Sequence, residues 1–324
     1  MVSIVLVQYD GAPCAIQAET PKPEPPLPET LHIYLHSPLR EAAEAGEVNI
    51  FNRLQVALPG WRLVYHPDKF VERSLAPGRG FGLFHMHEPN GARVLCLRRA
   101  YHYPFWRIEA TNERWHFDVT RARFEAGAID PAAARGWLRR WRPKIFGEAP
   151  VTQEGFVFLP LQGKLGEHRS FQSMSPLAMI EAVLERDPVR KLRATLHPKE
   201  AYSPADHQAL AALTARFSRF QLIQADAKDL LARCDYVASE NSSVALTGYF
   251  AAKRAVLFAG SDFHHVAGSV WRDDLATAFA SLEAPEPDWP AYLWWFFRQN
   301  AINGGDPDCE AQIRARLTRH GWPL

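Results

Sequence analysis

The sequence predicts an α/β protein with two Rossmann-like, doubly wound domains. Between residues 155 and 260, short apolar runs typical of strands alternate with runs typical of helices, and the connections are short. This alternation is characteristic of a parallel sheet covered by helices on both faces. A second series of strand-like and helix-like runs spans residues 30–97. The length of 324 residues fits two domains of ordinary size.

The first domain is expected over residues 1–150. Its strand-like segments are 2–7, 31–36, 61–66 and 94–97, and residues 37–58 have the pattern of a helix that Ser37 would cap. Residues 20–28 are rich in proline. Proline lacks an amide donor and fixes φ, so this stretch is predicted to be an extended connector.

The second domain is expected over residues 151–285, after a linker that begins at Glu148. Its predicted strands are 155–162, 191–198, 220–225, 236–240 and 255–260, and its predicted helices are 175–187, 204–217, 226–234 and 242–253. The remaining residues, 286–324, hold a tryptophan-rich segment and a final amphipathic helix. We expect these C-terminal helices to pack back on the first domain, because so many aromatic side chains require burial.

Composition excludes several classes of protein. Hydrophobic residues make up 47% and charged residues 23%, which is an ordinary globular balance. With 37 Lys and Arg against 36 Asp and Glu, the net charge of +1 excludes a general coat for polyanions. The apolar runs fall short of the ~20 residues of a membrane helix, and the four cysteines lack metal-site spacing. We expect a cytoplasmic protein with no transmembrane segment, compatible with peripheral membrane association.

Residues 93–144 are a local exception to this neutrality. They hold 12 Lys and Arg against five Asp and Glu, a net charge of +7, interleaved with four tryptophans. Basic residues among aromatics can bind single-stranded nucleic acid, and an arginine-rich surface can bind a small anion. The interpretation we favour is an arginine-rich helix that packs its tryptophans on the other domain, with no nucleic-acid partner.

Polar side chains follow the predicted strands of the second domain where each strand ends, and ligands of open parallel sheets bind at that edge. Ser242 alone is typical of a helix N-cap, and His197 of a strand end bonded to backbone. Together, at the ends of several strands of one sheet, they favour a site for a phosphate-bearing ligand. The candidate nucleotide-binding residues are Gln162, His197, Lys199, Glu240, Asn241, Ser242 and Ser243.

Familiar catalytic motifs are absent from the sequence. There is no GxGxxG after a strand, no P-loop, no GxSxG and no HExxH. His85, His87 and Glu88 could be metal ligands, a base with its orienting carboxylate, or an exposed strand end, and a helical segment would not aim both His264 and His265 at one ion. We therefore expect neither a metal nor a cofactor.

The string FVFLPLQ, a strand ending in His-Pro, and DYVASENSSVALTGYFAAKRAVLFAGSDFH resemble the capsule polysaccharide biosynthesis/export family. That family includes 3-deoxy-manno-octulosonic acid (Kdo) transferases of GT-B-like architecture. The resemblance covers roughly residues 155–265 and rests on PLQ at 160–162, HP at 197–198 and SS at 242–243. It implies a nucleotide-sugar, CMP-linked, in the crevice between two domains. The family's acidic residue after PLQ is missing here, and only Glu167 could replace it.

The resulting hypothesis is a glycosyltransferase of surface polysaccharide synthesis that acts on a glycan or glycolipid acceptor. Such a reaction needs a base for the acceptor hydroxyl and positive charge or donors for the leaving phosphate. His87 with Glu88, or Glu167, would supply the base, and Arg98, Arg99 and Arg107 would bind an anionic acceptor. Two alternatives stay open: a non-catalytic nucleotide- or glycan-binding relative, and a UDP-sugar epimerase or hydrolase.

Overall fold

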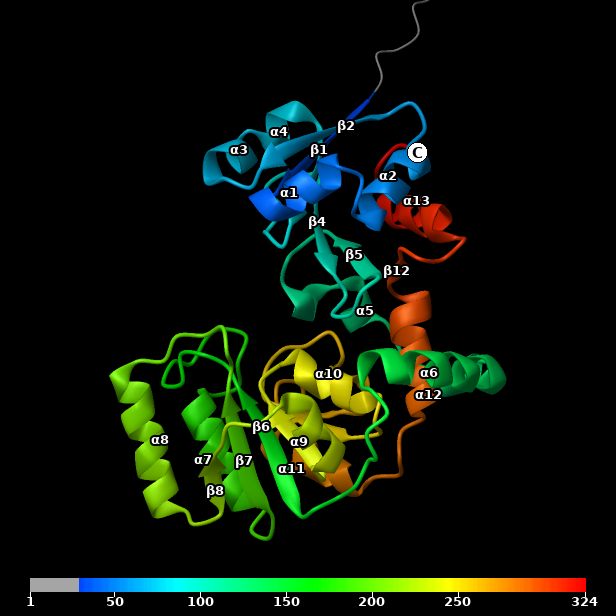
Figure 1. The fold of residues 1–324 in the computed structure, drawn as a ribbon. Helices are drawn as coiled ribbons and strands as arrows, with labels where there is room; N and C mark the ends of the chain where they lie inside the picture. Colours follow the sequence, from blue (N-terminus) through cyan, green and yellow to red (C-terminus); the bar gives the residue numbers. More distant parts are fainter. Residues whose placement is uncertain (1–28) are drawn as a thin grey trace, which may run out of the picture.

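A computed structural model describes residues 29–324, which form two α/β domains (Figure 1). One domain holds most of the chain before residue 117, and the other holds residues 156–283. Helices at one side of the molecule connect the two. The strand predicted at 2–7 and the proline-rich connector predicted at 20–28 lie outside the described residues.

The N-terminal domain is built on a six-stranded sheet with the order β12-β5-β4-β3-β1-β2. Neighbours among β1 to β4 pair in parallel, whereas β5 pairs antiparallel with both β4 and β12. Its strands are β1 Thr30–Leu35, β2 Arg62–Pro67, β3 Phe81–His85, β4 Val94–Arg99, β5 Phe105–Glu109 and β12 Ile302–Asn303. Its helices are α1 Ser37–Glu44, α2 Asn49–Ala57, α3 Phe70–Ser74, α4 Ala76–Arg79 and α13 Cys309–Arg319.

This domain departs from the prediction in two respects. The helix predicted over residues 37–58 is two helices, because the chain leaves α1 at Ala45 and Gly46 takes a φ of +73° that only glycine adopts easily. The sheet is not wholly parallel, because β5 returns beside β4 through a short turn instead of a crossover helix.

The C-terminal domain has a six-stranded parallel sheet with the order β11-β10-β9-β6-β7-β8. Its strands are β6 Phe156–Leu161, β7 Lys191–Leu196, β8 Phe220–Leu222, β9 Tyr236–Ser239, β10 Arg254–Leu257 and β11 Gly268–Ser269. Its helices are α7 Pro176–Arg186, α8 Pro204–Arg216, α9 Ala227–Arg233, α10 Ser243–Tyr249 and α11 Leu275–Ala280, with 3-10 turns at His264–Val266 and Ser281–Glu283. All residues of β6 are buried, as a central strand covered on both faces requires.

The two sheets confirm the predicted α/β class with two parallel-rich, Rossmann-like domains. The strand order reverses beside β6, where β7 leads to one edge and β9 to the other. Such a switch point leaves a crevice at the carboxyl ends of the strands, and this is where open α/β sheets bind ligands.

The connecting segments are short helices and one long helix at the junction. They are the 3-10 turns Arg114–His116 and Ala126–Ala128, helices α5 Asp118–Arg121, α6 Pro131–Ile145 and α12 Trp289–Trp294, and the π-helical turn Trp295–Gln299. Helix α6 packs across α12 (Figure 1). Trp137 of α6 is buried against Phe105 of β5, Phe250 after α10, and Phe297. One apolar cluster therefore includes side chains of both domains and of the C-terminal segment.

Candidate active site

The carboxyl ends of the two sheets meet at the domain junction. Tyr101 follows β4, and its hydroxyl donates a hydrogen bond to Asp262, which follows β10. Arg114 donates to the Tyr101 hydroxyl at 2.8 Å and to the backbone oxygen of Asn241, after β9, at 3.4 Å. Strand-end loops of one domain thus contact strand-end loops of the other, which is the arrangement that closes a crevice between two such sheets.

His197 and Lys199 lie at the carboxyl end of β7 with exposed side chains. The His197 backbone N–H donates to the Tyr202 hydroxyl at 2.8 Å, and its Nδ1 accepts from the Lys199 N–H at 3.2 Å, so the local backbone orients the ring. His197 lines a cavity of about 730 Å³ that continues to the loop after β8, where Ile223 and Gln224 line it. The cavity is large enough for a nucleoside and lies at the edge of the sheet where ligands bind.

The residues that follow β9 are placed by the start of α10. Ser242 is the N-cap of α10, because its hydroxyl accepts from the Val244 N–H at 3.3 Å. Ser243, the next residue, is exposed, whereas the Asn241 side chain is buried and donates to the Gly260 oxygen at 2.9 Å. Ser243 is therefore the residue of this turn that can reach a ligand from solvent, and Asn241 holds the turn against the loop after β10.

Glu240 is a buried carboxyl at the end of β9. It pairs with Arg169 at 3.2 Å through Oε2, while its Oε1 has no hydrogen-bond partner among the described residues. Burial raises the pKa of Glu240 to about 7, and the charge of Arg169 opposes this shift only in part. Arg169 is itself held by its backbone N–H, which donates to Gln172 at 2.7 Å. A buried carboxyl with an unused oxygen and a pKa near neutrality is typical of a functional site.

The two other candidates of the second domain lie in the loop between β6 and α7. Gln162 is half-buried directly after β6. Glu167 is exposed and pairs with Lys164 at 3.0 Å. The structure brings neither into a contact with the candidates after β9, and their assigned roles stay predictions.

His87 has an orienting carboxylate, although it is not Glu88. Its Nε2 lies 2.8 Å from Oδ2 of Asp68, which follows β2, and the other Asp68 oxygen pairs with Arg73. Glu88 points elsewhere, accepting from the Thr111 hydroxyl at 3.0 Å and from a backbone N–H at 2.7 Å. With its proton on Nε2 and donated to Asp68, the imidazole of His87 presents a lone pair at Nδ1, the form that a general base requires.

The three candidate acceptor-binding arginines occupy different environments. Arg107 is 2% exposed, lies 3.7 Å from Asp262 and donates to the Asn300 oxygen at 2.5 Å, so it joins the domains in the interior. Arg98 is half-buried and donates to the side chain of Asn112 at 3.0 Å. Arg99 is exposed. Of the three, Arg99 is the one that solvent and an acceptor can reach most freely.

Arg99 lines a cavity of about 470 Å³ at the carboxyl ends of β1, β3 and β4, together with His36 and His85. The imidazoles of His36 and His85 lie with their ring centres 5.7 Å apart. Burial lowers the pKa of His85 to about 4, so this ring is neutral at physiological pH. The cavity offers one permanent positive charge and two imidazoles at the end of β3, two residues before His87.

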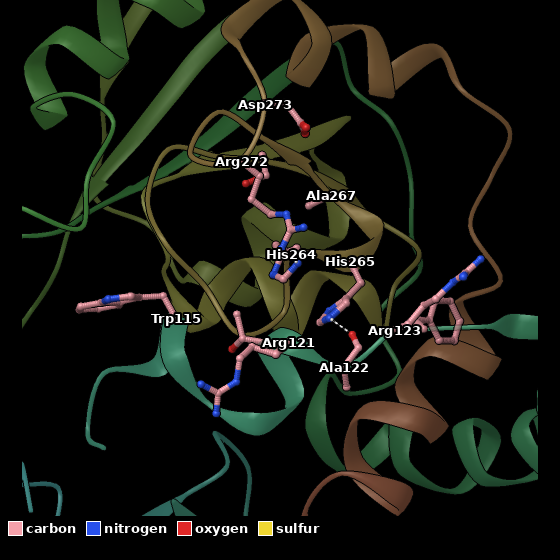
Figure 2. Close-up of a pocket in the computed structure, with 12 residues that line it drawn as sticks. Trp115, Arg121, Ala122, Arg123, His264, His265, Ala267, Arg272 and Asp273 are labelled. Atoms are coloured by element: carbon pink, nitrogen blue, oxygen red, sulfur yellow. Dashed lines mark hydrogen bonds between the residues drawn. The ribbon is translucent and has the colours of Figure 1, made fainter. Parts of the chain in front are cut away.

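A third cavity, of about 630 Å³, opens at the junction between α5 and the loop after β10 (Figure 2). Arg121, Arg123 and Arg272 lie around it, and the first two pair with acidic neighbours at 3.3 and 3.2 Å. His264 contacts the Ser261 oxygen at 2.9 Å and Arg272 at 2.8 Å, one through each ring nitrogen.

His265, the neighbour of His264, contacts the oxygen of Ala122 at 3.2 Å and the hydroxyl of Tyr292 at 3.3 Å, again one through each ring nitrogen. Burial lowers the pKa of His264 and lowers that of His265 to about 3. All four ring nitrogens of the pair therefore have protein partners, which is the chemistry of structural histidines.

Glu109, Asp118 and His320 are the one group among residues 29–324 whose donor atoms cluster as metal ligands would. Arg316, Arg319 and Arg121 all lie within 3.4 Å of Asp118. These guanidinium groups already neutralise the Asp118 carboxylate, so this group of residues resembles a cluster of ion pairs and not a metal site.

Sequence reasoning missed Asp68 and Arg169. Asp68 directly follows β2 and comes two residues after the segment predicted as a strand at 61–66, so the strand-end rule applied to the second domain would have found it in the first. Arg169 comes from a loop, and no periodicity or motif marks it; only the fold brings it to Glu240.

No protein-family model matches the chain, and no curated protein matches it. Solved structures do overlay on it. The beta Kdo 2,7 transferase of Thermosulfurimonas dismutans KpsC is 13% identical, covers 90% of this chain and 99% of that one, and has a TM-score of 0.48. The Methanocaldococcus jannaschii UDP-GlcNAc 2-epimerase is 9% identical over 90% and 100% of the two chains, with a TM-score of 0.37. The wall teichoic acid polymerase TagF is 10% identical over 90% and 88%, with a TM-score of 0.32.

The structural neighbours therefore include Kdo transferases of the kind that the sequence resembles. Each TM-score is below 0.5, so these likenesses identify neither a donor nor a reaction for this chain. Within residues 29–324, no helix has the length and apolarity needed to cross a bilayer.

Proposed function

We propose that this protein is a glycosyltransferase of surface polysaccharide synthesis that transfers a sugar from a CMP-linked, Kdo-like donor to a glycan acceptor. One observation supports the proposal: the carboxyl ends of two parallel-rich sheets meet, with the candidate nucleotide-binding residues on one and an oriented histidine on the other. This division suits a transferase of two substrates, because it can hold the donor and the acceptor close together in a fixed orientation.

The nucleotide would bind along the C-terminal sheet. The base and ribose would occupy the cavity beside His197, and Glu240 would hydrogen-bond the donor through its unused oxygen. Strands β7 and β9 flank β6, so their ends lie about two strand spacings, or ~10 Å, apart. A nucleoside phosphate can bridge that span, which would place its phosphate between Lys199 and Ser243.

The acceptor would bind against the N-terminal sheet, near Arg99. Nδ1 of His87 would take the proton of the acceptor hydroxyl as its oxygen bonds to the anomeric carbon of the donor. The bond from that carbon to the phosphate oxygen breaks, and the electron pair leaves with the nucleoside phosphate. Positive charge and donors on the C-terminal sheet would stabilise this leaving group.

A thermal-shift panel with CMP, CDP, UMP, UDP, GDP and ADP tests the donor. A ligand that binds only the native state raises the melting temperature. Selective stabilisation by CMP that disappears in His197→Ala, followed by CMP release from CMP-Kdo with a glycan acceptor, is the expected result. Stabilisation by UDP alone would indicate a UDP-sugar enzyme instead. No response to any nucleotide would indicate a non-catalytic relative.

A further inference from the structure

Helix α6 carries a basic face that the proposed reaction does not use. Its fifteen residues include no Asp or Glu. They include five basic residues: Arg135, Arg139, Arg140, Arg142 and Lys144. None of the five forms an ion pair with an acidic side chain among residues 29–324, whereas arginines elsewhere in the structure do so repeatedly.

The opposite face of α6 is fully engaged by the protein. Trp137 is 3% exposed, and Ala134 and Ile145 are buried. Trp141 is half-buried and packs at a tilt against Phe105, with ring centres 4.7 Å apart. The tryptophans thus anchor the helix on the junction, and its exposed basic side chains are left for another partner.

Unpaired like charges on one helix repel each other and cost stability unless an anionic partner offsets the repulsion. Arg135 and Arg139 are one turn apart, as are Arg140 and Lys144, so both flanks of the exposed half carry charge. We propose that α6 docks this protein on an anionic lipid bilayer by electrostatic adsorption. Each basic residue near such a surface contributes about 1 kcal/mol, or about fivefold in affinity.

The burial of Trp137 argues against single-stranded nucleic acid as the partner. Proteins that bind it use exposed aromatic side chains as stacking platforms for the bases, and here Trp137 is covered. The packing of the α6 tryptophans also argues against insertion of α6 into the bilayer, because an inserting helix needs a free apolar face. Adsorption to the surface of an anionic bilayer needs only exposed positive charge, and the basic side chains of α6 provide it.

Sedimentation of the full chain with vesicles tests the proposal. One set is phosphatidylcholine alone, and the other is phosphatidylcholine with phosphatidylglycerol. We expect binding only to the second set, weakening as salt rises because screening shortens the range of surface charge from about 10 Å at 0.1 M to about 3 Å at 1 M.

Two variants with equal net charge locate the effect. The first replaces Arg135, Arg139, Arg140 and Lys144 with Gln, which keeps good helix formers at exposed sites. The second replaces Arg62, Arg93, Arg186 and Lys191, exposed residues outside α6, with Gln. The first is expected to lose about fivefold in vesicle affinity per residue, and the second is expected to bind like the native protein.

Equal binding to neutral vesicles, equal loss in both variants, or native binding by the first variant would each overturn the proposal. Tighter binding to a single-stranded RNA oligonucleotide than to anionic vesicles, lost in the first variant, would also overturn it. Melting temperatures of both variants confirm that they are folded. Because no readout is turnover, the result is independent of the proposed glycosyl transfer.

Discussion

The two sheet ends that meet at the junction differ in how many of their polar side chains already have a partner within the protein. On the C-terminal sheet, His197 and Ser243 are exposed, and Glu240 keeps an oxygen without a partner. On the N-terminal sheet, His87 already has its partner Asp68, and Asp68 is in turn fixed by Arg73. Side chains without a partner in the part of the chain that the structure describes, such as Ser243 and Glu240 Oε1, suit the binding of a ligand. An imidazole that is already oriented by a carboxylate, such as that of His87, suits proton transfer. This difference is the reason that the proposed function gives ligand binding to the C-terminal sheet and proton transfer to the N-terminal sheet.

The largest effect is expected from His87→Ala. Loss of a general base lowers the rate of sugar transfer by about 10²–10⁴-fold, while nucleotide affinity, which depends on the other sheet, stays unchanged. Sugar transfer measured as CMP release, with CMP binding measured by calorimetry, checks both halves. Glu88→Gln is the matched control, because Glu88 contacts Thr111 and not His87. Equal losses in the two variants would contradict the assignment of the base.

A smaller effect, on the affinity for CMP and not on the rate of sugar transfer, is expected from His197→Ala. Hydrogen bonds to charged groups contribute roughly 1.5–3 kcal/mol, so the affinity for CMP should fall about tenfold to a hundredfold, with the fold intact because the side chain is exposed. Titration calorimetry measures it. Lys191→Ala, at the amino end of the same strand, should leave affinity unaltered. An unaltered affinity in His197→Ala would remove the binding role from this sheet end.

The smallest effect concerns Glu240 and pH. Its pKa is about 7 in the folded chain against 4.5 for an ordinary glutamate, so the folded state holds the proton more tightly. Native stability attributable to this group therefore falls as pH rises from about 5 to 8. Glu240→Gln cannot ionise and should escape that loss, gaining about 1–2 kcal/mol over the native chain at pH 8 compared with pH 5.

Urea unfolding of both proteins at the two pH values measures this difference. The same pH dependence in Glu240→Gln and in the native chain would show that Glu240 is ionised throughout, and would place its carboxylate among the permanently charged groups of the crevice.

The sequence predicted the central strands β6 and β9 of the C-terminal sheet well because each is a buried apolar run followed by a polar turn. Strand β6, predicted at 155–162 and found at Phe156–Leu161, is an example. Strand β12 could not be predicted, because two residues carry no pattern and its pairing with β5 joins segments far apart in the chain. The division of α1 from α2 depends on Gly46. It ends the helix because its φ is positive, and the sequence does not show which φ a glycine takes.

The candidate site was predictable to the extent that its residues follow strands. His87, His197 and Glu240 obey that rule. The partner of His87 was predicted as its neighbour in the chain, Glu88, whereas the sheet places Asp68 beside it, because β2 and β3 both flank β1. Arg169 reaches Glu240 from a loop whose course no local pattern encodes.

The contact of Asp262 with Tyr101 and Arg107 has a consequence for the integrity of the whole chain. Asp262 is fully buried, and its partners come from the other domain. Separating the domains would break this buried pair and would expose to water the apolar cluster that both domains share. We therefore expect the two domains to unfold in one cooperative event instead of behaving as independent modules.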